Sequence, residues 1–191
     1  MNPDADFKSD LLAAIPALRA FAASLCGRVE WADDLVQETL VKAWANRNSF
    51  EPGSRMQAWL FTILRNEYYS EYRRRRHEVA DPEGRIAARL TTHPAQDSHV
   101  AFREFQTALF KLPPIHREAL ILVGASGFSY EQAAAICNCA IGTMKSRVAR
   151  ARSKLGQLLP LEAHGTAGAD EAIENIGQLV TAGADRGGGD C

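Results

Sequence analysis

The sequence predicts an all-α protein of two small helical domains joined by a flexible linker. Apolar residues recur at helical spacing in two blocks, at about residues 7–77 and 100–160. Neither block alternates apolar and polar residues over more than a few positions, as a half-buried strand would. Between them, Pro82, Gly84 and Pro94 interrupt a segment that has no long amphipathic repeat. We therefore expect domains at 7–78 and 100–160 and a linker at 79–99.

Composition gives no sign of a membrane protein. The chain has 191 residues, is 46% hydrophobic and has a formal net charge of -1, and no apolar run approaches the roughly 18 residues that span a bilayer. The start, "MNPDADFKSD", lacks the pattern of a signal peptide. We expect a cytoplasmic protein with no membrane contact. Residues 161–191 are acidic and glycine-rich, which predicts a disordered tail with at most one short helix at about 170–180.

Metal, cofactor and redox chemistry are not expected. The four cysteines, Cys26, Cys137, Cys139 and Cys191, lack the spacing of a zinc ribbon, and the five histidines are dispersed. Cys137 and Cys139 are interpreted as small buried residues beside a turn. The sequence therefore predicts a protein without a metal or cofactor.

A basic helix near the end of the second block suggests DNA binding. The stretch "CNCAIGTMKSRVARARSKL" (137–155) has five basic residues and no acidic one. One side of this helix is an apolar stripe of Met144, Val148, Ala151 and Leu155. The remaining sides carry Thr143, Lys145, Ser146, Ala149, Arg150, Arg152 and Lys154, with Arg147 nearer the stripe. Small residues flanked by cations suit base edges and phosphates of a major groove, although a basic face that is merely solvated is the alternative.

The segment before this helix predicts a helix-turn-helix. Ser129 can cap a short helix, with Gln132 as its capping-box partner. Ala133, Ala134 and Ile136 supply a small buried face, and Asn138 tolerates the positive φ of a tight turn. The recognition helix is then expected at about 142–154. A small helical scaffold module without DNA binding remains the alternative.

An acidic helix is expected in the first block. In "WADDLVQETLVKAWANRNSF", Asp33 is predicted to cap it. The expected apolar face is Leu35, Val36, Leu40, Ala43 and Trp44, and the expected outer face is Asp34, Gln37, Glu38 and Lys42. An outer face of this kind is either solvated or the contact site of a partner.

A tyrosine and arginine segment follows in "MQAWLFTILRNEYYSEYRRRR". Trp59, Leu60, Ile63 and Leu64 are expected in the core, and the continuation mixes Tyr68, Tyr69 and Tyr72 with Arg65, Arg73, Arg74, Arg75 and Arg76. Aromatic rings beside cations suit unpaired DNA, because each stacked base contributes about 1–3 kcal/mol and the cations hold the backbone. The alternative is that the tyrosines pack and the arginines face water.

Together these motifs resemble a known family. The order "DDLVQETLVKAW", "AWLFTILRNEYYSEYRRRR", "LPPIHREALILV" and "GFSYEQAAAICNCAIGTMKSRVARARSKL" is similar to bacterial RNA polymerase sigma factors of the extracytoplasmic-function (ECF) group. "RNEYYSEYRRRR" and the helix-turn-helix resemble in particular the EcfG-type general stress sigma factors of alphaproteobacteria. The resemblance covers about residues 7–159. It departs at Asn138, where glycine is more usual, and at Pro113 to His116.

The resemblance implies a transcription initiation factor that is not an enzyme and that associates with the nucleoid in the holoenzyme. It implies that Asp34, Gln37 and Glu38 contact the clamp helices of the polymerase β′ subunit, and that residues 109–123 meet the β flap. Residues 65–76 would read and melt the −10 element, with Asn66, Glu67, Tyr68 and Tyr69 near an extruded base. The −35 element would be read by Lys145, Ser146, Ala149 and Arg150, and its phosphates bound by Thr143, Arg147, Arg152 and Lys154.

The resemblance also implies a partner that inhibits the protein. A small anti-sigma factor of the NepR kind would wedge between the two helical domains and be released by a PhyR-like response regulator.

Two other functions are compatible with parts of the sequence. A stand-alone helix-turn-helix repressor would use the second block alone, as a dimer on a palindrome, and would leave the first block without a role. A nuclease would need Asp33, Asp34 and Glu38 as metal ligands, but these residues lie on one plain helix with no second acidic cluster nearby.

Overall fold

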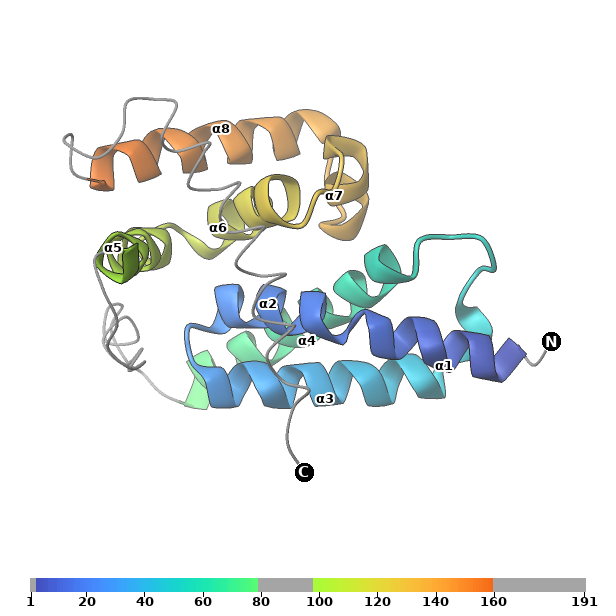
Figure 1. Cartoon of the computed structure of the whole chain (residues 1–191). Helices are drawn as coiled ribbons and strands as arrows, with labels where there is room; N and C mark the ends of the chain where they lie inside the picture. Colours follow the sequence, from blue (N-terminus) through green and yellow to red (C-terminus); the bar gives the residue numbers. More distant parts are fainter. Residues whose placement is uncertain (1–2, 79–97, 160–191) are drawn as a thin grey trace. The chain divides into compact units, whose positions relative to one another are not determined.

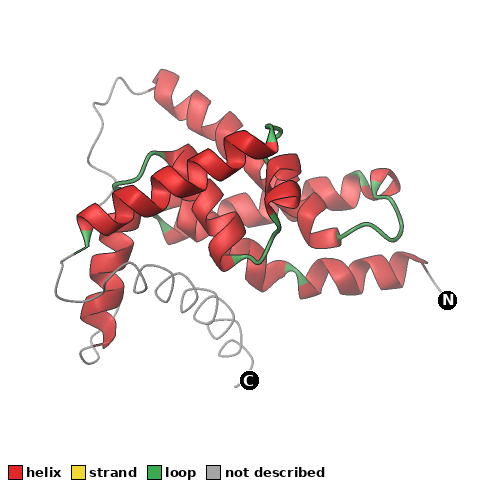
Figure 2. Cartoon of the chain, turned by 90° about the horizontal axis from the view of Figure 1, so that it is seen from above, coloured by secondary structure: helices red, strands yellow, loops and turns green. Residues whose placement is uncertain are grey.

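The computed structural model describes residues 3–78 and 98–159, which belong to two separate compact units (Figure 1). The described residues form helices and connecting loops, with no strand among them (Figure 2), so the all-α prediction is confirmed for this part of the chain. Nearly all of the predicted linker and the whole predicted tail lie outside the described residues, and the predicted domain limits remain predictions.

The described part of the first unit, residues 3–78, contains four α-helices and one 3₁₀ turn. They are α1 (Pro3–Ala13), α2 (Ile15–Cys26), α3 (Val29–Ala45), the 3₁₀ turn η1 (Arg47–Ser49) and α4 (Met56–Glu78). The core lies where α2, α3 and α4 pack together, and the rings of Phe21 and Phe61 stack there with centroids 4.5 Å apart. The other fully buried side chains of this core include Leu18, Leu25, Leu60 and Leu64.

The start of α3 differs from the prediction. Gly27 ends α2 with a φ of 68°, which a residue without Cβ adopts readily, and α3 begins at Val29. Asp33 therefore lies inside the helix and pairs with Arg19 across 3.1 Å instead of capping. The longer helix buries Trp31 and Ala32 in its first turns, and burying an aromatic side chain outweighs the roughly 1 kcal/mol that a cap contributes.

The apolar face predicted for α3 is only partly buried. Leu35, Val36 and Ala43 are core residues and Leu40 is half-buried, but Trp44 is 41% exposed. Trp44 lies near the C-terminal end of the helix, where its ring contacts Phe7 of α1. The prediction that Trp44 belongs to the buried face is therefore wrong, although its neighbour Ala43 in the same turn is fully buried.

The second unit contains α5 (Ser98–Phe110), α6 (Pro114–Leu120), α7 (Tyr130–Ile136) and α8 (Ile141–Leu158). A single π-turn, Ile121–Ala125, extends α6, and Ser126 donates its N–H to the Ile121 carbonyl at 2.8 Å. Helix α8 packs on both α6 and α7. Large buried side chains of this core are Phe105, Leu120, Leu122, Phe128, Met144 and Leu155.

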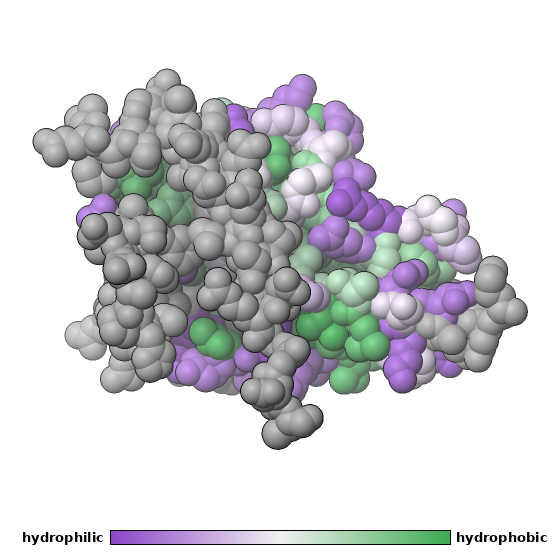
Figure 3. All heavy atoms as spheres, viewed as in Figure 1, coloured by the Kyte–Doolittle hydropathy of each residue, from purple (hydrophilic) through white to green (hydrophobic). Residues whose placement is uncertain are grey.

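The described surface includes several large apolar side chains. Large exposed apolar side chains are Leu12, Val29, Val41 and Trp44 in the first unit and Ile115 and Ile141 in the second. On the face shown in Figure 3, hydrophilic residues border the apolar areas. Among the described helices, none is by itself long and apolar enough to cross a membrane. One bent pair of helices within residues 6–26 is long and apolar enough when its two members are taken together, by length and composition alone.

Candidate nucleic-acid interface

Helix α8 places its residues as its sequence pattern predicts. Met144, Val148, Ala151 and Leu155 are all buried, with at most 1% of each residue exposed. The residues that lie outward and exposed are Thr143, Lys145, Ala149, Arg150, Arg152 and Lys154, whereas Ser146 and Arg147 are half-buried. The apolar stripe therefore anchors the helix and leaves a basic face with a small residue, Ala149, near its centre.

The turn before α8 has the geometry of a Schellman motif. Asn138 has a φ of 48° and donates its N–H to the Ala135 carbonyl, while Cys139 donates to the Ala134 carbonyl. The predicted positive φ at Asn138 is thus confirmed. Cys137 is buried as expected, and Cys139 is only half-buried. The turn ends α7 sharply at Ile136, and only four residues separate it from the start of α8 at Ile141.

The start of α7 is held by the predicted capping box. Gln132 donates its backbone N–H to the Ser129 hydroxyl at 3.2 Å, and Ser129 donates its N–H to the Gln132 side chain at 3.0 Å. The ammonium of Lys145 lies 5.9 Å from the ring centroid of Tyr130. The capping box thus holds the start of α7, and the Lys145 contact links that start to α8.

His116 belongs to the basic side of the second unit, which the sequence did not reveal. It lies in the first turn of α6, which packs on α8. Burial lowers the pKa of His116 below its ordinary value of 6.5, and the nearby guanidinium groups of Arg150 and Arg147 lower it further. The only sequence feature that singled out His116 was the departure from the family pattern at Pro113 to His116.

Helix α4 presents two different polar sides. Asn66, Ser70 and Arg73 are exposed and recur at helical spacing, so they share one open side. The second side faces α3 and carries Glu67 and Glu71, together with Arg74. Only the backbone of Arg76 is described. The predicted −10 residues are therefore divided between an open side and a side directed at a neighbouring helix.

The tyrosines of α4 are not equally accessible. Tyr68 is 2% exposed, and its ring stacks on Trp31 of α3 with centroids 5.4 Å apart. Tyr69 and Tyr72 are half-buried, and the Arg65 guanidinium lies 4.8 Å from the centroid of Tyr69. The expectation that Tyr68 lies near an extruded base is corrected by this burial, because the ring fills the space between α3 and α4.

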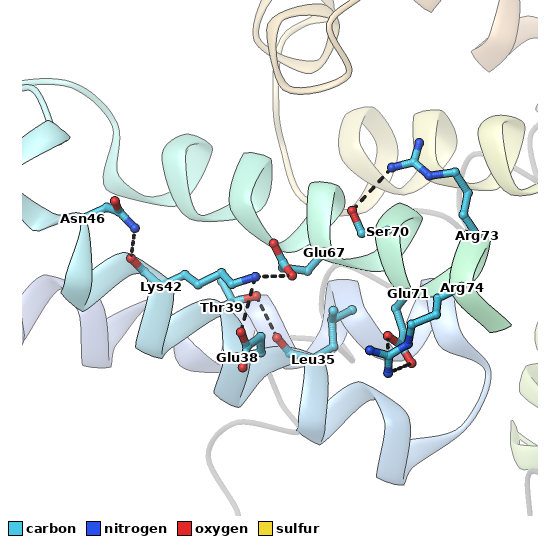
Figure 4. A network of polar contacts seen from close by, with 10 residues as sticks. All are labelled: Leu35, Glu38, Thr39, Lys42, Asn46, Glu67, Ser70, Glu71, Arg73 and Arg74. Atoms are coloured by element: carbon cyan, nitrogen blue, oxygen red, sulfur yellow. Dashed lines mark hydrogen bonds and ion pairs between the residues drawn. The ribbon is translucent and has the colours of Figure 1, made fainter.

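A charged pocket of about 470 Å³ lies between α3 and α4. Its lining residues are Trp31, Asp34, Leu35, Glu38, Lys42, Glu67, Glu71, Arg74 and Arg75. Lys42 Nζ lies 2.6 Å from Glu67 Oε2 and 3.3 Å from Glu38 Oε1 (Figure 4). Arg74 and Arg75 both pair with Glu71, at 3.0 and 2.8 Å. The pocket thus joins two of the predicted polymerase contacts to part of the predicted −10 segment.

These ion pairs shift the pKa values of Lys42 and Glu71. The hydrogen bond from Lys42 to Glu67 raises the pKa of Lys42, although burial opposes it. The hydrogen bond from Arg75 lowers the pKa of Glu71, again against burial. Both shifts favour the charged forms of Lys42 and Glu71.

The acidic residues of α3 do not form a metal site. Asp34, Gln37 and Glu38 are exposed along its outer side. Asp33 is tied to Arg19 and Glu38 to Lys42. Within the described residues, no group of three or more His, Cys, Asp or Glu side chains could hold a metal ion.

Each unit matches one region of a protein family. Residues 12–78 match Sigma-70 region 2, and residues 102–155 match Sigma-70 region 4. These ranges coincide with the helices that contain the two polar surfaces described above.

Individual relatives give the same result. The chain is 59% identical over 169 residues to the ECF RNA polymerase sigma factor EcfG of Rhodopseudomonas palustris, covering 88% of this chain and 93% of that protein. The solved sigma factor RpoE of Bartonella quintana, in complex with the anti-sigma factor NepR, aligns with a TM-score of 0.73 and 57% identity, covering 82% of this chain and 98% of that one. CnrH, solved in complex with the cytosolic domain of CnrY, aligns with a TM-score of 0.63 and 27% identity, covering 86% of this chain and 92% of that one.

Proposed function

We infer that this chain, which belongs to the ECF sigma factors of bacterial RNA polymerase, directs core polymerase to promoters through two DNA contacts, one on each helical unit. The observation that carries the inference is the presence of both Sigma-70 regions in a chain 59% identical to an EcfG protein over most of its length. The polymerase supplies the catalysis, and the chain itself performs no covalent chemistry.

Helix α8 is proposed to read the −35 element. Its exposed basic face supports this role, because cations at the rims of a recognition helix reach phosphates while the central residues reach base edges. The proposed base contacts are Lys145, Ser146, Ala149 and Arg150, and the proposed phosphate contacts are Thr143, Arg147, Arg152 and Lys154. His116 is close enough to Arg150 to lie at the edge of this surface.

Helix α4 is proposed to capture the −10 element as single-stranded DNA. The open side with Asn66 and Arg73 supports this, and the half-buried rings of Tyr69 and Tyr72 still offer edges for base contact. Arg65 holds the ring of Tyr69 in place. Tyr68 is assigned to the core that supports this surface.

The acidic side of α3 is proposed to bind polymerase. Asp34, Gln37 and Glu38 are exposed and lie on successive turns of one helix, as a helix-to-helix contact with β′ requires. For the β flap, the segment 109–123 offers few exposed side chains, notably Lys111 and Ile115. These two residues are the first to test there.

We further propose that an anti-sigma factor of the NepR kind controls the protein, in a general stress response in the cytoplasm. The support is the 57% identity to RpoE, which was solved in complex with NepR. An antagonist of this kind would act by occupying surfaces that polymerase or DNA needs.

Run-off transcription tests the proposed function. Purified core polymerase, with and without the full chain, is given genomic promoter fragments at moderate salt. Discrete transcripts that require the chain are expected, and their start sites locate the −35 and −10 elements. A chain that neither binds core polymerase nor starts transcription would overturn the proposal. Palindrome-dependent operator binding by the chain alone would then support the repressor alternative.

A further inference from the structure

Lys42 is the one cation lining the pocket between α3 and α4 that has no role in the proposed function. Asp34 and Glu38 belong to the proposed polymerase contacts, and Glu67 and Arg74 lie within the proposed −10 segment. Lys42 lies between these groups, and its ammonium reaches both helices (Figure 4).

The charges of the pocket are distributed unevenly. Its carboxylates are Asp34, Glu38, Glu67 and Glu71, and its cations are Lys42, Arg74 and Arg75. Arg74 and Arg75 both pair with Glu71. Lys42 pairs with the other two carboxylates that form ion pairs here, Glu38 and Glu67. Its shorter contact, 2.6 Å, is to Glu67, whose side chain is only 23% exposed. The Lys42 to Glu67 pair is therefore the principal charge link between α3 and α4 at this end of the pocket.

The position of Glu67 on α4 makes this link important for DNA. Glu67 follows Asn66, the first residue of the open side, and precedes the core residue Tyr68. A carboxylate released from Lys42 would turn outward to regain water, toward the side that carries Asn66 and Arg73. There it would repel the phosphates of a bound strand.

We propose that Lys42 is a positioning residue for −10 recognition: it holds the Glu67 carboxylate against α3 and keeps its negative charge off the open side of α4. This inference rests on the proposed function, because it assumes that the open side binds single-stranded DNA.

The test compares two affinities of the full-length protein. The variant Lys42→Met removes the charge, and Lys42→Arg retains it. Lys8→Met, at an exposed position of α1, is the matched control. For each protein, one measurement gives the affinity for core polymerase. The other gives the affinity of the saturated holoenzyme for a single-stranded oligonucleotide carrying a −10 element found by run-off transcription. Circular dichroism checks folding, and Lys42→Gln replaces Lys42→Met if the latter does not fold.

We expect Lys42→Met to change the affinity for the oligonucleotide more than the affinity for core polymerase. Lys42→Met should weaken oligonucleotide binding about two- to fivefold, the size expected for one half-exposed ion pair, and change core affinity less than twofold. Lys42→Arg and Lys8→Met should stay within twofold of the wild type in both measurements. A parallel fall in both affinities for Lys42→Met, or no difference from Lys8→Met, would overturn the inference.

A double-mutant cycle identifies Glu67 as the intermediary. In the Glu67→Gln background, Lys42→Met should cost less than twofold in oligonucleotide binding, because no released carboxylate remains. Additive effects would show that Lys42 acts by another route and would overturn the inference. A wild-type protein that starts no transcription overturns the proposed function, whereas an active wild type with any of these contrary results overturns only the role of Lys42.

Discussion

Trp31 of α3 and Tyr68 of α4 stack with their ring centroids 5.4 Å apart, and the Arg75 guanidinium lies 4.5 Å from the centroid of the same indole. The contact joins the first turns of α3, which carries the proposed polymerase contacts, to the middle of α4, which carries the proposed −10 contacts. A residue that the sequence placed beside DNA is thus part of the core that holds these helices together.

Tyr68→Ala should therefore act mainly on stability. Removing a buried aromatic side chain is expected to lower the free energy of unfolding by about 3–5 kcal/mol, and Tyr68→Phe should cost much less because it keeps the ring. Urea unfolding of the full chain measures both. The prediction is contradicted if Tyr68→Ala has normal stability but cannot bind a −10 oligonucleotide. That result would show that Tyr68 contacts DNA directly.

Asn138 should tolerate glycine and resist β-branched residues. Its φ of 48° lies in the left-handed region, where glycine carries no Cβ penalty and other residues cost about 1–2 kcal/mol. Asn138→Gly should match or exceed wild-type stability, and Asn138→Val should lower it and weaken −35 binding. Thermal unfolding and binding to a promoter duplex check the pair. Equal behaviour of the two variants would contradict the role of the turn.

The capping box should be measurable at Ser129. Ser129→Ala removes the acceptor of the Gln132 N–H and is expected to cost about 1 kcal/mol. Ser153→Ala, at an exposed position inside α8, is the control and should be neutral or slightly stabilising. Equal stability of the two variants in urea unfolding would show that the cap does not support α7.

Arg150 and Arg152 should differ in what they recognise. Arg150→Ala is expected to cost about 1–3 kcal/mol at one −35 position and to relax the preference there, because it removes the proposed base contact. Arg152→Ala should weaken all promoters alike and reduce the salt dependence, because it removes a phosphate contact. Holoenzyme binding to a set of promoters substituted at each −35 position tests both. The same uniform loss for both variants would refute the division into base and phosphate contacts.

His116 should make the stability of the second unit depend on pH. Its folded pKa lies below 6.5, so the unfolded chain binds the proton more tightly. The stabilising contribution is complete above pH 6.5 and is lost as the pH falls from 6.5 through the lower folded pKa. The free energy of unfolding of His116→Gln should therefore fall less steeply with pH in that window than that of the wild type. Identical slopes would show that burial and the guanidinium groups of Arg150 and Arg147 do not lower the pKa of His116.

The local features of the helix-turn-helix could be predicted because they depend on neighbours in the chain. The Ser129 and Gln132 cap, the positive φ of Asn138 and the buried face of α8 are each decided within a few residues. The family resemblance, which the comparisons confirm, rests on the same short motifs. Local sequence predicted less well where a long-range contact opposed a local one. Asp33 was predicted to cap α3, but α3 begins earlier, at Val29, and buries Trp31 in its first turn.

The sequence by itself determined the helical class, the apolar stripe of α8 and the family, because periodicity, caps and turn residues act locally. Only the tertiary structure decided which members of the tyrosine and arginine segment are available to a partner. A single helix offers Tyr68, Glu67 and Asn66 on adjacent sides, and nothing in that helix says which side a neighbour covers. Packing against α3 buried Tyr68, bound Glu67 to Lys42 and left Asn66 in the open.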